Sequence, residues 1–136
     1  MMIWKHKNNE ADWHMVRETV FVEEQGFEHE FDDIDDKAQH ITLYINDMLA
    51  GCVRYYQEDG AYRIGRLAVL PDFRKQGCGG LLLEHAEEEI KTRGGIEVYL
   101  DAQYRVKGFY EKAGYVVCGK EHMDEHVPHV LMKKKL

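Results

Sequence analysis

The sequence predicts an α/β layered domain built around a mixed, mostly antiparallel sheet of about seven strands. Apolar residues switch several times between helical and strand-like spacing, the strand-like runs are rich in β-branched and aromatic residues, and turn-forming residues separate them. In chain order the elements read β-α-β-β-β-α-β-α-β-β. A chain of 136 residues without an internal repeat has the size of one domain, which we place at 1–136.

The first elements are a strand, a helix and a loop. Residues 2–7 (MIWKHK) favour a short strand. Apolar residues then recur at helical spacing from Trp13 to Phe21, and Gly26 supplies a stop signal. Residues 27–38 (FEHEFDDIDDKA) are dense in carboxylates, which predicts an exposed loop with a short helical turn.

Three antiparallel strands follow. The runs 40–45 (HITLYI) and 48–58 (MLAGCVRYYQE) are separated by the turn-forming pair Asn-Asp, which predicts a hairpin. The pair Asp-Gly then leads into 61–70 (AYRIGRLAVL), which continues the hairpin as a third strand.

The second half begins with the main helix. Pro71 ends the preceding strand, and from Gly77 to Arg93 apolar residues recur four apart while glutamates face water. Residues 96–102 (IEVYLDA) are expected to add a strand parallel to 61–70 through a right-handed crossover.

The last elements are a short helix at 106–113 (VKGFYEKA) and two strands, 115–120 (YVVCGK) and 129–135 (HVLMKKK). The polar residues 121–128 (EHMDEHVP) are expected to form a loop between these two strands.

Composition limits the classes of partner. A formal net charge of −7 argues against nucleic acid, whose phosphates are bound by clustered Lys and Arg, and favours a cationic small molecule. No apolar run is long enough to span a membrane, and the N-terminal residues do not resemble a signal peptide. Cys52, Cys78 and Cys118 are an odd number without CxxC pairing, which favours free thiols in the cytoplasm.

The stretch RKQGCGG, from Arg74 to Gly80, predicts a phosphate site. Backbone amides at a helix N-terminus attract anions, and glycines leave room for a ligand to approach. Arg74 and Lys75 add positive charge, so a pyrophosphate is a fitting ligand. A P-loop is excluded because Leu81 follows the last glycine, and the dinucleotide fingerprint fails at Leu82.

The glycine stretch instead resembles the R/Q-x-x-G-x-G/A signature of the GNAT superfamily of acyl-CoA-dependent N-acetyltransferases, through Arg74, Gly77 and Gly79. GFYEKAGY, from Gly108 to Tyr115, is similar to the next conserved block of that superfamily. VFVEEQGF, DDKAQH, LDAQ and VPHVLM extend the resemblance to the small bacterial ElaA-like branch over nearly the whole chain.

The resemblance implies a GNAT fold that binds acetyl-CoA as co-substrate. The backbone of Leu67, Ala68 and Val69 would hold the acetyl carbonyl and the pantetheine amides. Tyr110 would protonate the departing thiolate, although the alternative is an aromatic side chain that only packs the short helix. The implied cofactor-binding residues are Leu67, Ala68, Val69, Arg74, Lys75, Gln76, Gly77, Cys78, Gly79, Gly80, Gln103, Phe109 and Tyr110.

The attacking amine must lose a proton, and histidine is suited to accept it. His129 is the first candidate, because similar proteins of the glyphosate-acetyltransferase type use a histidine in a matching ending, and His40 is the second. Each could instead be a structural histidine at a strand end. His122, His126 and His129 have metal-like spacing, but Pro128 opposes a continuous helix, so we expect no metal.

The expected function is transfer of acetyl from acetyl-CoA to a primary amine of a small molecule or peptide, by direct attack in a ternary complex. Alternatives are a non-catalytic acyl-CoA sensor and an enzyme resembling the acyl-homoserine-lactone synthases. The acceptor is expected to be cationic, nucleic acid and membrane are not expected partners, and a homodimer is possible. Two interpretations stay open for the acidic segment: an entrance that concentrates ammonium groups, or a solvated loop. The carboxylates of this segment are Glu28, Glu30, Asp32, Asp33, Asp35 and Asp36.

Overall fold

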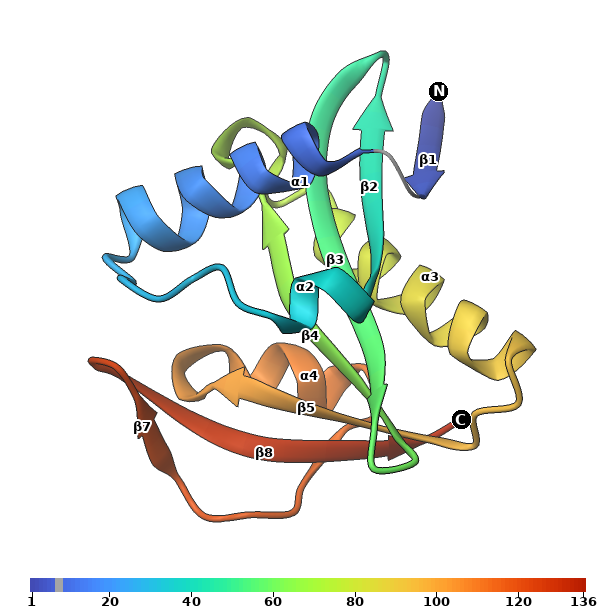
Figure 1. Cartoon of the computed structure of the whole chain (residues 1–136), viewed down its shortest axis with the longest axis vertical. Coiled ribbons are helices and arrows are strands. Elements are labelled where there is room, and N and C mark those ends of the chain that lie inside the picture. Colours follow the sequence, from blue (N-terminus) through green and yellow to red (C-terminus); the bar gives the residue numbers. More distant parts are fainter. Residues whose placement is uncertain (7–8) are drawn as a thin grey trace.

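The computed structural model, which describes residues 1–6 and 9–136, contains one open sheet with helices on both faces (Figure 1). The strands are β1 (Met2–His6), β2 (Gln39–Ile45), β3 (Met48–Glu58), β4 (Ala61–Val69), β5 (Glu97–Gln103), β6 (Val116–Val117), β7 (His122–Asp124) and β8 (Val127–Lys135). The helical elements are α1 (Glu10–Arg17), the π-helix η1 (Glu18–Glu24), α2 (Ile34–Lys37), the 3-10 turn η2 (Pro71–Phe73), α3 (Cys78–Thr92), the 3-10 turn η3 (Tyr104–Val106) and α4 (Lys107–Lys112). None of the helices in the described part is long and apolar enough to cross a lipid bilayer.

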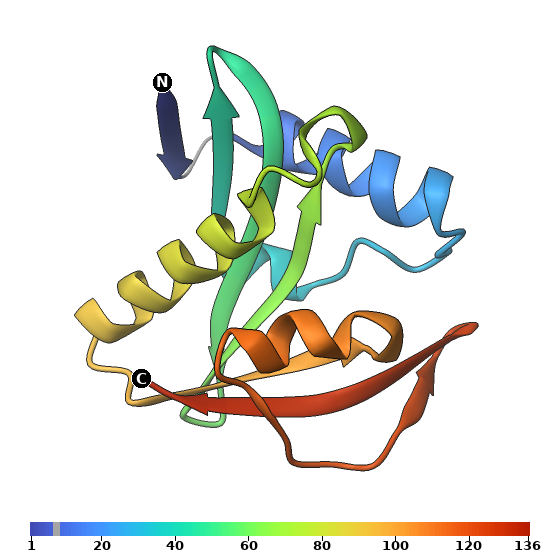
Figure 2. The same ribbon diagram turned by 180° about the vertical axis from the view of Figure 1, so that it is seen from behind.

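The strand order is β1-β2-β3-β4-β5-β8-β6, with β7 paired to β8. All neighbouring strands are antiparallel except β4 and β5, which are parallel as predicted for the crossover through α3. Helices α1 and α2 lie on one face of the sheet, and Figure 2 shows α3 and α4 on the other. The predicted fold class is therefore confirmed.

Most predicted elements are found close to their expected positions. The strand expected at 2–7 is found as β1, and residue 7 of the expected range lies outside the described residues. The turn between β2 and β3 places Asn46 and Asp47 at positive φ, which is the conformation that a two-residue hairpin of this kind requires. The helical turn expected within the acidic segment is α2.

One prediction was wrong: the expected loop at 121–128 contains β7 and the start of β8. A tight turn with Glu125 at a φ of 53° joins the two strands. All three residues of β7 are exposed, so this edge hairpin lacks the alternation of apolar and polar residues that normally identifies a strand. The sheet consequently has eight strands rather than about seven.

The core lies on both faces of the sheet. Leu82, Leu83, Ala86 and Ile90 of α3 are buried against one face, as their spacing predicted for all but Leu83. Trp13, Val16 and other apolar residues of α1 and η1 form a second cluster against the opposite face. The sheet is thereby held between two helical layers, which fixes the positions of its strand ends.

β4 and β5 pair over only three residues and then separate. Their register ends at Ile64 and Leu100, while β4 continues to Val69 with β3 as its hydrogen-bonding neighbour. A bulge interrupts the β3–β4 register, and Arg66 within it has a φ of 53°. The separation leaves the final residues of β4 without a strand partner on the β5 side.

Gly51 of β3 allows β4 to approach closely, which generates a stability prediction. A Cβ atom at Gly51 would lie 2.6 Å from the backbone oxygen of Ala68, whereas one at Gly65 of β4 would meet nothing closer than 3.9 Å. Gly51→Ala should therefore lower the free energy of unfolding by about 1 to 3 kcal/mol, while Gly65→Ala should be close to neutral. Urea unfolding of both variants measures this difference, and equal midpoints would contradict the close packing described for Gly51.

Candidate functional site

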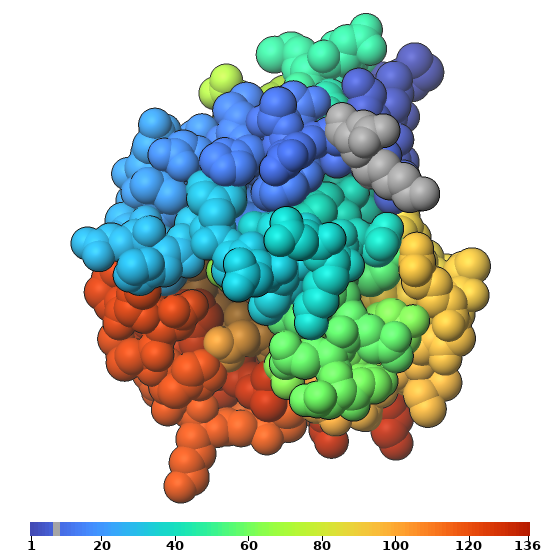
Figure 3. All heavy atoms as spheres, in the orientation of Figure 1, coloured from blue at the N-terminus to red at the C-terminus, as the bar shows by residue number. Residues whose placement is uncertain are grey.

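A cavity of about 640 Å³ opens where β4 and β5 separate. The space-filling view shows a hollow between the blue and cyan N-terminal segments and the red C-terminal strands (Figure 3). Residues from η1, β4, β5, α4 and the β7–β8 hairpin line the cavity. Those among them that the sequence predicted are Leu67, Ala68, Val69, Arg74, Gln103, Tyr110 and His129.

The backbone of β4 presents polar groups to this cavity. The amide of Leu70 donates to the oxygen of Ala50 on β3 at 2.8 Å. Because successive residues of a strand face opposite sides, the amide and carbonyl of Val69 face the cavity. The Val69 carbonyl accepts a hydrogen bond from Nε of Arg74 at 3.0 Å. The Val69 amide is therefore the group left to donate to a ligand.

The predicted phosphate loop lies at the N-terminus of α3. The amide of Leu81 is the first to donate within the helix, to the oxygen of Gly77 at 3.1 Å, so the amides of the preceding turn project from the helix end. Gly77 has a φ of +81°, which favours glycine at this position. The remaining predicted loop residues are neighbours of Gly77 in the chain, and they do not line the cavity: Lys75, Gln76, Cys78, Gly79 and Gly80.

Phe109 and Cys78 flank this loop in different ways. A Cβ atom at Gly79 would lie 3.4 Å from the Phe109 ring, so α4 packs closely on the start of α3. Phe109 remains partly exposed and offers an apolar surface beside the loop. Cys78 is buried, and burial raises the pKa of its thiol, which disfavours the reactive thiolate.

Arg74 connects the loop to the opposite wall of the cavity. Its Nη1 and Nη2 atoms lie 3.0 and 2.6 Å from the carboxylate of Glu24 in η1. This bidentate hydrogen bond lowers the pKa of Glu24. The guanidinium therefore bridges two sides of the cavity mouth, instead of standing free at the edge of the loop.

Tyr110 lines the cavity from α4. Its ring is half-buried against Tyr115, at a centroid distance of 5.9 Å. Burial raises the pKa of Tyr110 to about 12, so the phenol keeps its proton at neutral pH. The side chain packs α4 and also lines the cavity, so the structure leaves both sequence interpretations of Tyr110 open.

His129 lies on β8 with its ring almost completely buried, 6% exposed. Its Nδ1 atom is 2.9 Å from the carbonyl oxygen of Val127. Because a carbonyl can only accept, Nδ1 carries the hydrogen and Nε2 is left as an acceptor. This tautomer suits a residue that takes a proton from a substrate.

His40 is placed elsewhere and does not line the cavity. Its ring stacks on Trp13 at a centroid distance of 3.9 Å, and Nε2 donates to the backbone oxygen of Asp35 at 3.0 Å. Burial lowers the pKa of His40. These contacts describe a structural histidine at the start of β2, which is the alternative that the sequence left open.

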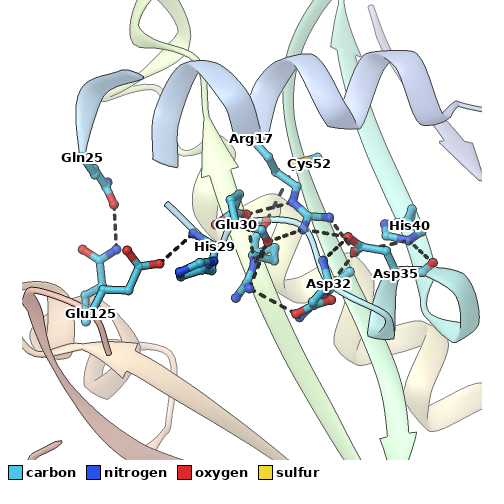
Figure 4. A network of polar contacts seen from close by, with 12 residues as sticks. Arg17, Gln25, His29, Glu30, Asp32, Asp35, His40, Cys52 and Glu125 are labelled. Carbon is cyan, nitrogen blue, oxygen red and sulfur yellow. Dashed lines mark hydrogen bonds and ion pairs between the residues drawn. The ribbon is translucent and has the colours of Figure 1, made fainter. Parts of the chain in front are cut away.

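The acidic segment contributes to a buried ion network, which neither sequence interpretation anticipated. Glu30 is only 4% exposed, and its carboxylate lies 2.9 Å from both Arg17 and Arg66. Figure 4 shows the side chain of Arg17 and this carboxylate below α1. The six members of the ion network are Arg17, Arg54, Arg66, Glu30, Asp32 and Asp35.

The carboxylates of the network differ in the net direction of their pKa shifts. Burial raises the pKa of Glu30 in spite of the neighbouring arginines. Burial would also raise the pKa of Asp35, but hydrogen bonds and charge from Arg17 and Arg54 outweigh it and lower the value to about 2. Asp35 is therefore the carboxylate whose ionised form the folded protein stabilises most clearly.

Several residues at the cavity were missed by sequence reasoning. Arg66 of the ion network forms part of its lining. Glu30 does so as well, and the sequence had named it only within the candidate entrance formed by the acidic segment. Glu125, in the β7–β8 turn, accepts from the amides of Glu28 and His29 at 2.8 and 2.9 Å and so joins the acidic segment to the hairpin. The sequence contains no local signal for these contacts, because nothing in it indicates the positive φ of Arg66 or the exposed strand β7.

Comparison with known proteins gives one consistent relationship. A model of the acetyltransferase (GNAT) domain matches residues 8–136. YjcF, an uncharacterised N-acetyltransferase of Bacillus subtilis strain 168, is 34% identical over 136 residues, covering 98% of this chain and 97% of YjcF. A candidate N-acetyltransferase from Lactobacillus plantarum has a solved structure with a TM-score of 0.90 and 31% identity, covering 99% of this chain and 98% of that one.

Structures with lower identity share the fold. Escherichia coli ElaA has a TM-score of 0.88 at 24% identity, with 98% of this chain and 99% of that chain covered. A GNAT family acetyltransferase from Elizabethkingia anophelis, solved with acetyl-CoA bound, has a TM-score of 0.78 at 15% identity, with 99% and 98% covered.

The ion network generates a prediction about pH. The pKa of Asp35 falls from 3.8 to about 2 on folding, so its ionised form stabilises the protein above about pH 4, and this contribution is lost as the pH falls towards 2. Asp35→Asn should lower the free energy of unfolding by about 2 kcal/mol at pH 7. Urea unfolding at pH 7, 4 and 3 should show that the difference in unfolding free energy between the wild type and Asp35→Asn becomes smaller as the pH falls.

Glu30→Gln is the matched comparison, because folding raises the pKa of Glu30 instead of lowering it. The ionised form of Glu30 is therefore disfavoured by folding, and Glu30→Gln should cost less stability at pH 7 than Asp35→Asn. If the Asp35→Asn deficit were the same at pH 7 and pH 3, the assignment of this stabilisation to ionised Asp35 would be wrong.

Proposed function

Because the chain belongs to the GNAT acetyltransferase family, we propose that it transfers the acetyl group of acetyl-CoA to a primary amine of a small molecule or peptide, in a single ternary complex. One observation carries this proposal: Val69 of β4, Tyr110 of α4 and His129 of β8 line the same cavity. Acyl transfer from a thioester to an amine needs an oxyanion donor, a proton donor for sulfur and a base.

Acetyl-CoA is proposed as the acetyl donor because of the glycine loop and because of similar proteins. The amides at the start of α3 would bind the CoA pyrophosphate, and the Phe109 surface would contact its apolar parts. The E. anophelis relative was solved with acetyl-CoA, which supports the same donor here. In this arrangement the pantetheine would enter the cavity along the unpaired edge of β4.

In the proposed reaction the bound ammonium first gives one proton to Nε2 of His129, and the neutral amine nitrogen then attacks the thioester carbon. The second proton that nitrogen loses as the amide forms balances the one that the sulfur gains. The amide of Val69 donates to the developing oxyanion, a contact worth about 3 kcal/mol in comparable sites. The carbon–sulfur bond then breaks, and the Tyr110 hydroxyl donates to the departing thiolate. Holding both reactants together lowers the activation free energy further, by about 7 to 11 kcal/mol at best.

The pKa of Tyr110 defines how this donor acts. A value of about 12 lies well above that of an ordinary thiol, about 8.5, so complete proton transfer to the thiolate is uphill while the site is closed. The hydroxyl therefore stabilises the thiolate mainly as a hydrogen-bond donor, and the thiol takes its final proton as product leaves.

The acceptor is proposed to be cationic in its free form. Asp101, Asp124 and Glu125 line the cavity on the side of β5 and the β7–β8 hairpin, where His129 also lies. Carboxylates there raise the local concentration of ammonium groups. Cys52, Cys78 and Cys118 are free thiols in the structure, in keeping with the proposed cytoplasmic setting.

The direct test incubates the protein with acetyl-CoA and pooled amines, follows thiol release and identifies the acetylated product by mass. Diamines and aminoglycosides should be acetylated faster than neutral or acidic amines. If acetyl-CoA binds but no amine raises thiol release above hydrolysis, the non-catalytic acyl-CoA sensor replaces this proposal. An acyl product on an amino lactone would favour the alternative resembling acyl-homoserine-lactone synthases.

Tyr110→Phe tests the proton donor and keeps the packing ring. We expect the turnover number to fall about 100-fold, because the thiolate loses its hydrogen bond, with little change in acetyl-CoA affinity. Steady-state thiol release and calorimetric binding measure the two quantities. Phe109→Leu is the control for the helix and should weaken acetyl-CoA binding more than turnover; unchanged turnover in Tyr110→Phe would remove Tyr110 from the reaction.

His129→Gln and His40→Gln distinguish the two candidate bases. His129→Gln should lower turnover about 100-fold and remove the acidic limb of the pH–rate profile, because Gln cannot accept the proton. His40→Gln should keep that limb, since His40 does not line the cavity. A profile that loses its acidic limb in His40→Gln instead would reverse the assignment.

A further inference from the structure

Three side chains outside the cavity bring their ligand atoms together on the β1 side of α3. His6 comes from β1, and His85 and Glu89 lie one turn apart on α3. One imidazole nitrogen from each histidine and one carboxylate oxygen lie within 4.8 Å of one another. We infer that His6, His85 and Glu89 form a binding site for a divalent transition-metal ion, with Zn²⁺ as its occupant.

Two of the three distances between ligand atoms agree with tetrahedral coordination, and the contact between His6 and Glu89 would have to lengthen. The Nε2 atoms of His6 and His85 are 3.3 Å apart, and Nε2 of His85 is 3.2 Å from Oε2 of Glu89. Nε2 of His6 also contacts the same carboxylate oxygen. Zinc bound to nitrogen and oxygen at about 2.0 to 2.1 Å separates tetrahedral ligands by about 3.3 Å, so one ion fits among the three atoms after small side-chain movements.

Neighbouring residues hold two of the ligands in this orientation. The ring of Trp4 stacks on His85 at a centroid distance of 4.1 Å. The buried Tyr55 donates its hydroxyl to Oε1 of Glu89 at 2.6 Å, which leaves Oε2 directed towards the histidines. Metal sites characteristically fix their carboxylate and imidazole ligands through such outer hydrogen bonds and packing.

The ligand set selects the class of metal. Two imidazoles and one carboxylate suit Zn²⁺ and other late first-row ions, whereas Mg²⁺ and Ca²⁺ prefer sites made only of oxygen. The ligands are partly exposed, with side-chain exposures of 40% for His6, 29% for His85 and 25% for Glu89. Water can therefore supply a fourth ligand.

The location gives the ion a structural role. β1 is the edge strand of the sheet, joined to β2 on one side. A metal held by His6, His85 and Glu89 would attach this strand to α3 in addition. Binding should therefore stabilise the folded protein, because the complete ligand set exists only in the folded state.

The first test titrates Zn²⁺ into metal-free protein and measures affinity by competition with a chromophoric chelator. The wild type should bind one ion, and His85→Ala and Glu89→Gln should each weaken binding about 100-fold. Glu88→Gln is the matched control: it removes the same charge from the adjacent, more exposed position on α3 and should bind as the wild type does. His122→Ala tests the exposed His122–Asp101 pair and should also leave the affinity unchanged.

The second test examines the supporting hydrogen bond through Tyr55→Phe, which keeps the buried ring. This variant should bind Zn²⁺ about 10-fold more weakly than the wild type. Cobalt substitution should give the intense visible bands of a four-coordinate ion, and they should be lost in Glu89→Gln. Thermal melts with chelator establish that every variant folds. Wild-type binding weaker than about 100 µM, or equal affinity in His85→Ala and Glu88→Gln, would overturn the assignment.

Discussion

The buried ion network is the interaction on which the shape of the cavity depends. Burying charges is costly unless geometry and hydrogen bonds compensate for lost hydration, and here three arginines meet three carboxylates at hydrogen-bond distances. Arg17 belongs to α1, Arg54 and Arg66 to the sheet, and the carboxylates to the segment that crosses between them. The network thereby fixes an otherwise irregular segment against the sheet, and this segment forms one wall of the cavity.

The opposite wall depends on the separation of β4 and β5. The bulge at Arg66 serves both walls, because it interrupts the sheet and also directs the guanidinium towards Glu30. Gln103 donates to Gln25 at 2.8 Å, and Glu125 caps the acidic segment, so further contacts join the two halves across the cavity. The chemistry-bearing groups consequently lie on regular elements, while side-chain contacts between distant segments set their separation.

Sequence reasoning identified the elements whose signals are local. Turn pairs, the apolar spacing of α3 and the glycine loop each occupy a few consecutive residues, and they located the hairpins of β2, β3 and β4, the main helix and the loop before it. The role of residues 67–69 came from the family resemblance. The ion network could not be found in this way, because Arg17, Glu30 and Arg66 are distant in sequence and a carboxylate-rich run resembles a solvated loop. β7 was missed because both its faces are exposed, and His85 and Glu89 stand on the helix face that periodicity assigns to solvent.

The hydrogen bond from Arg74 to Val69 also bears on the behaviour of the protein in solution. An unpaired length of strand is a template on which another chain can add by backbone pairing, and such edges promote aggregation. Here the edge is internal, interrupted by a bulge, and covered at its end by a guanidinium that occupies the Val69 carbonyl and is anchored by Glu24. The open edge on which the proposed ligand would lie is therefore covered at its end by a charged side chain, which opposes backbone pairing with a second polypeptide.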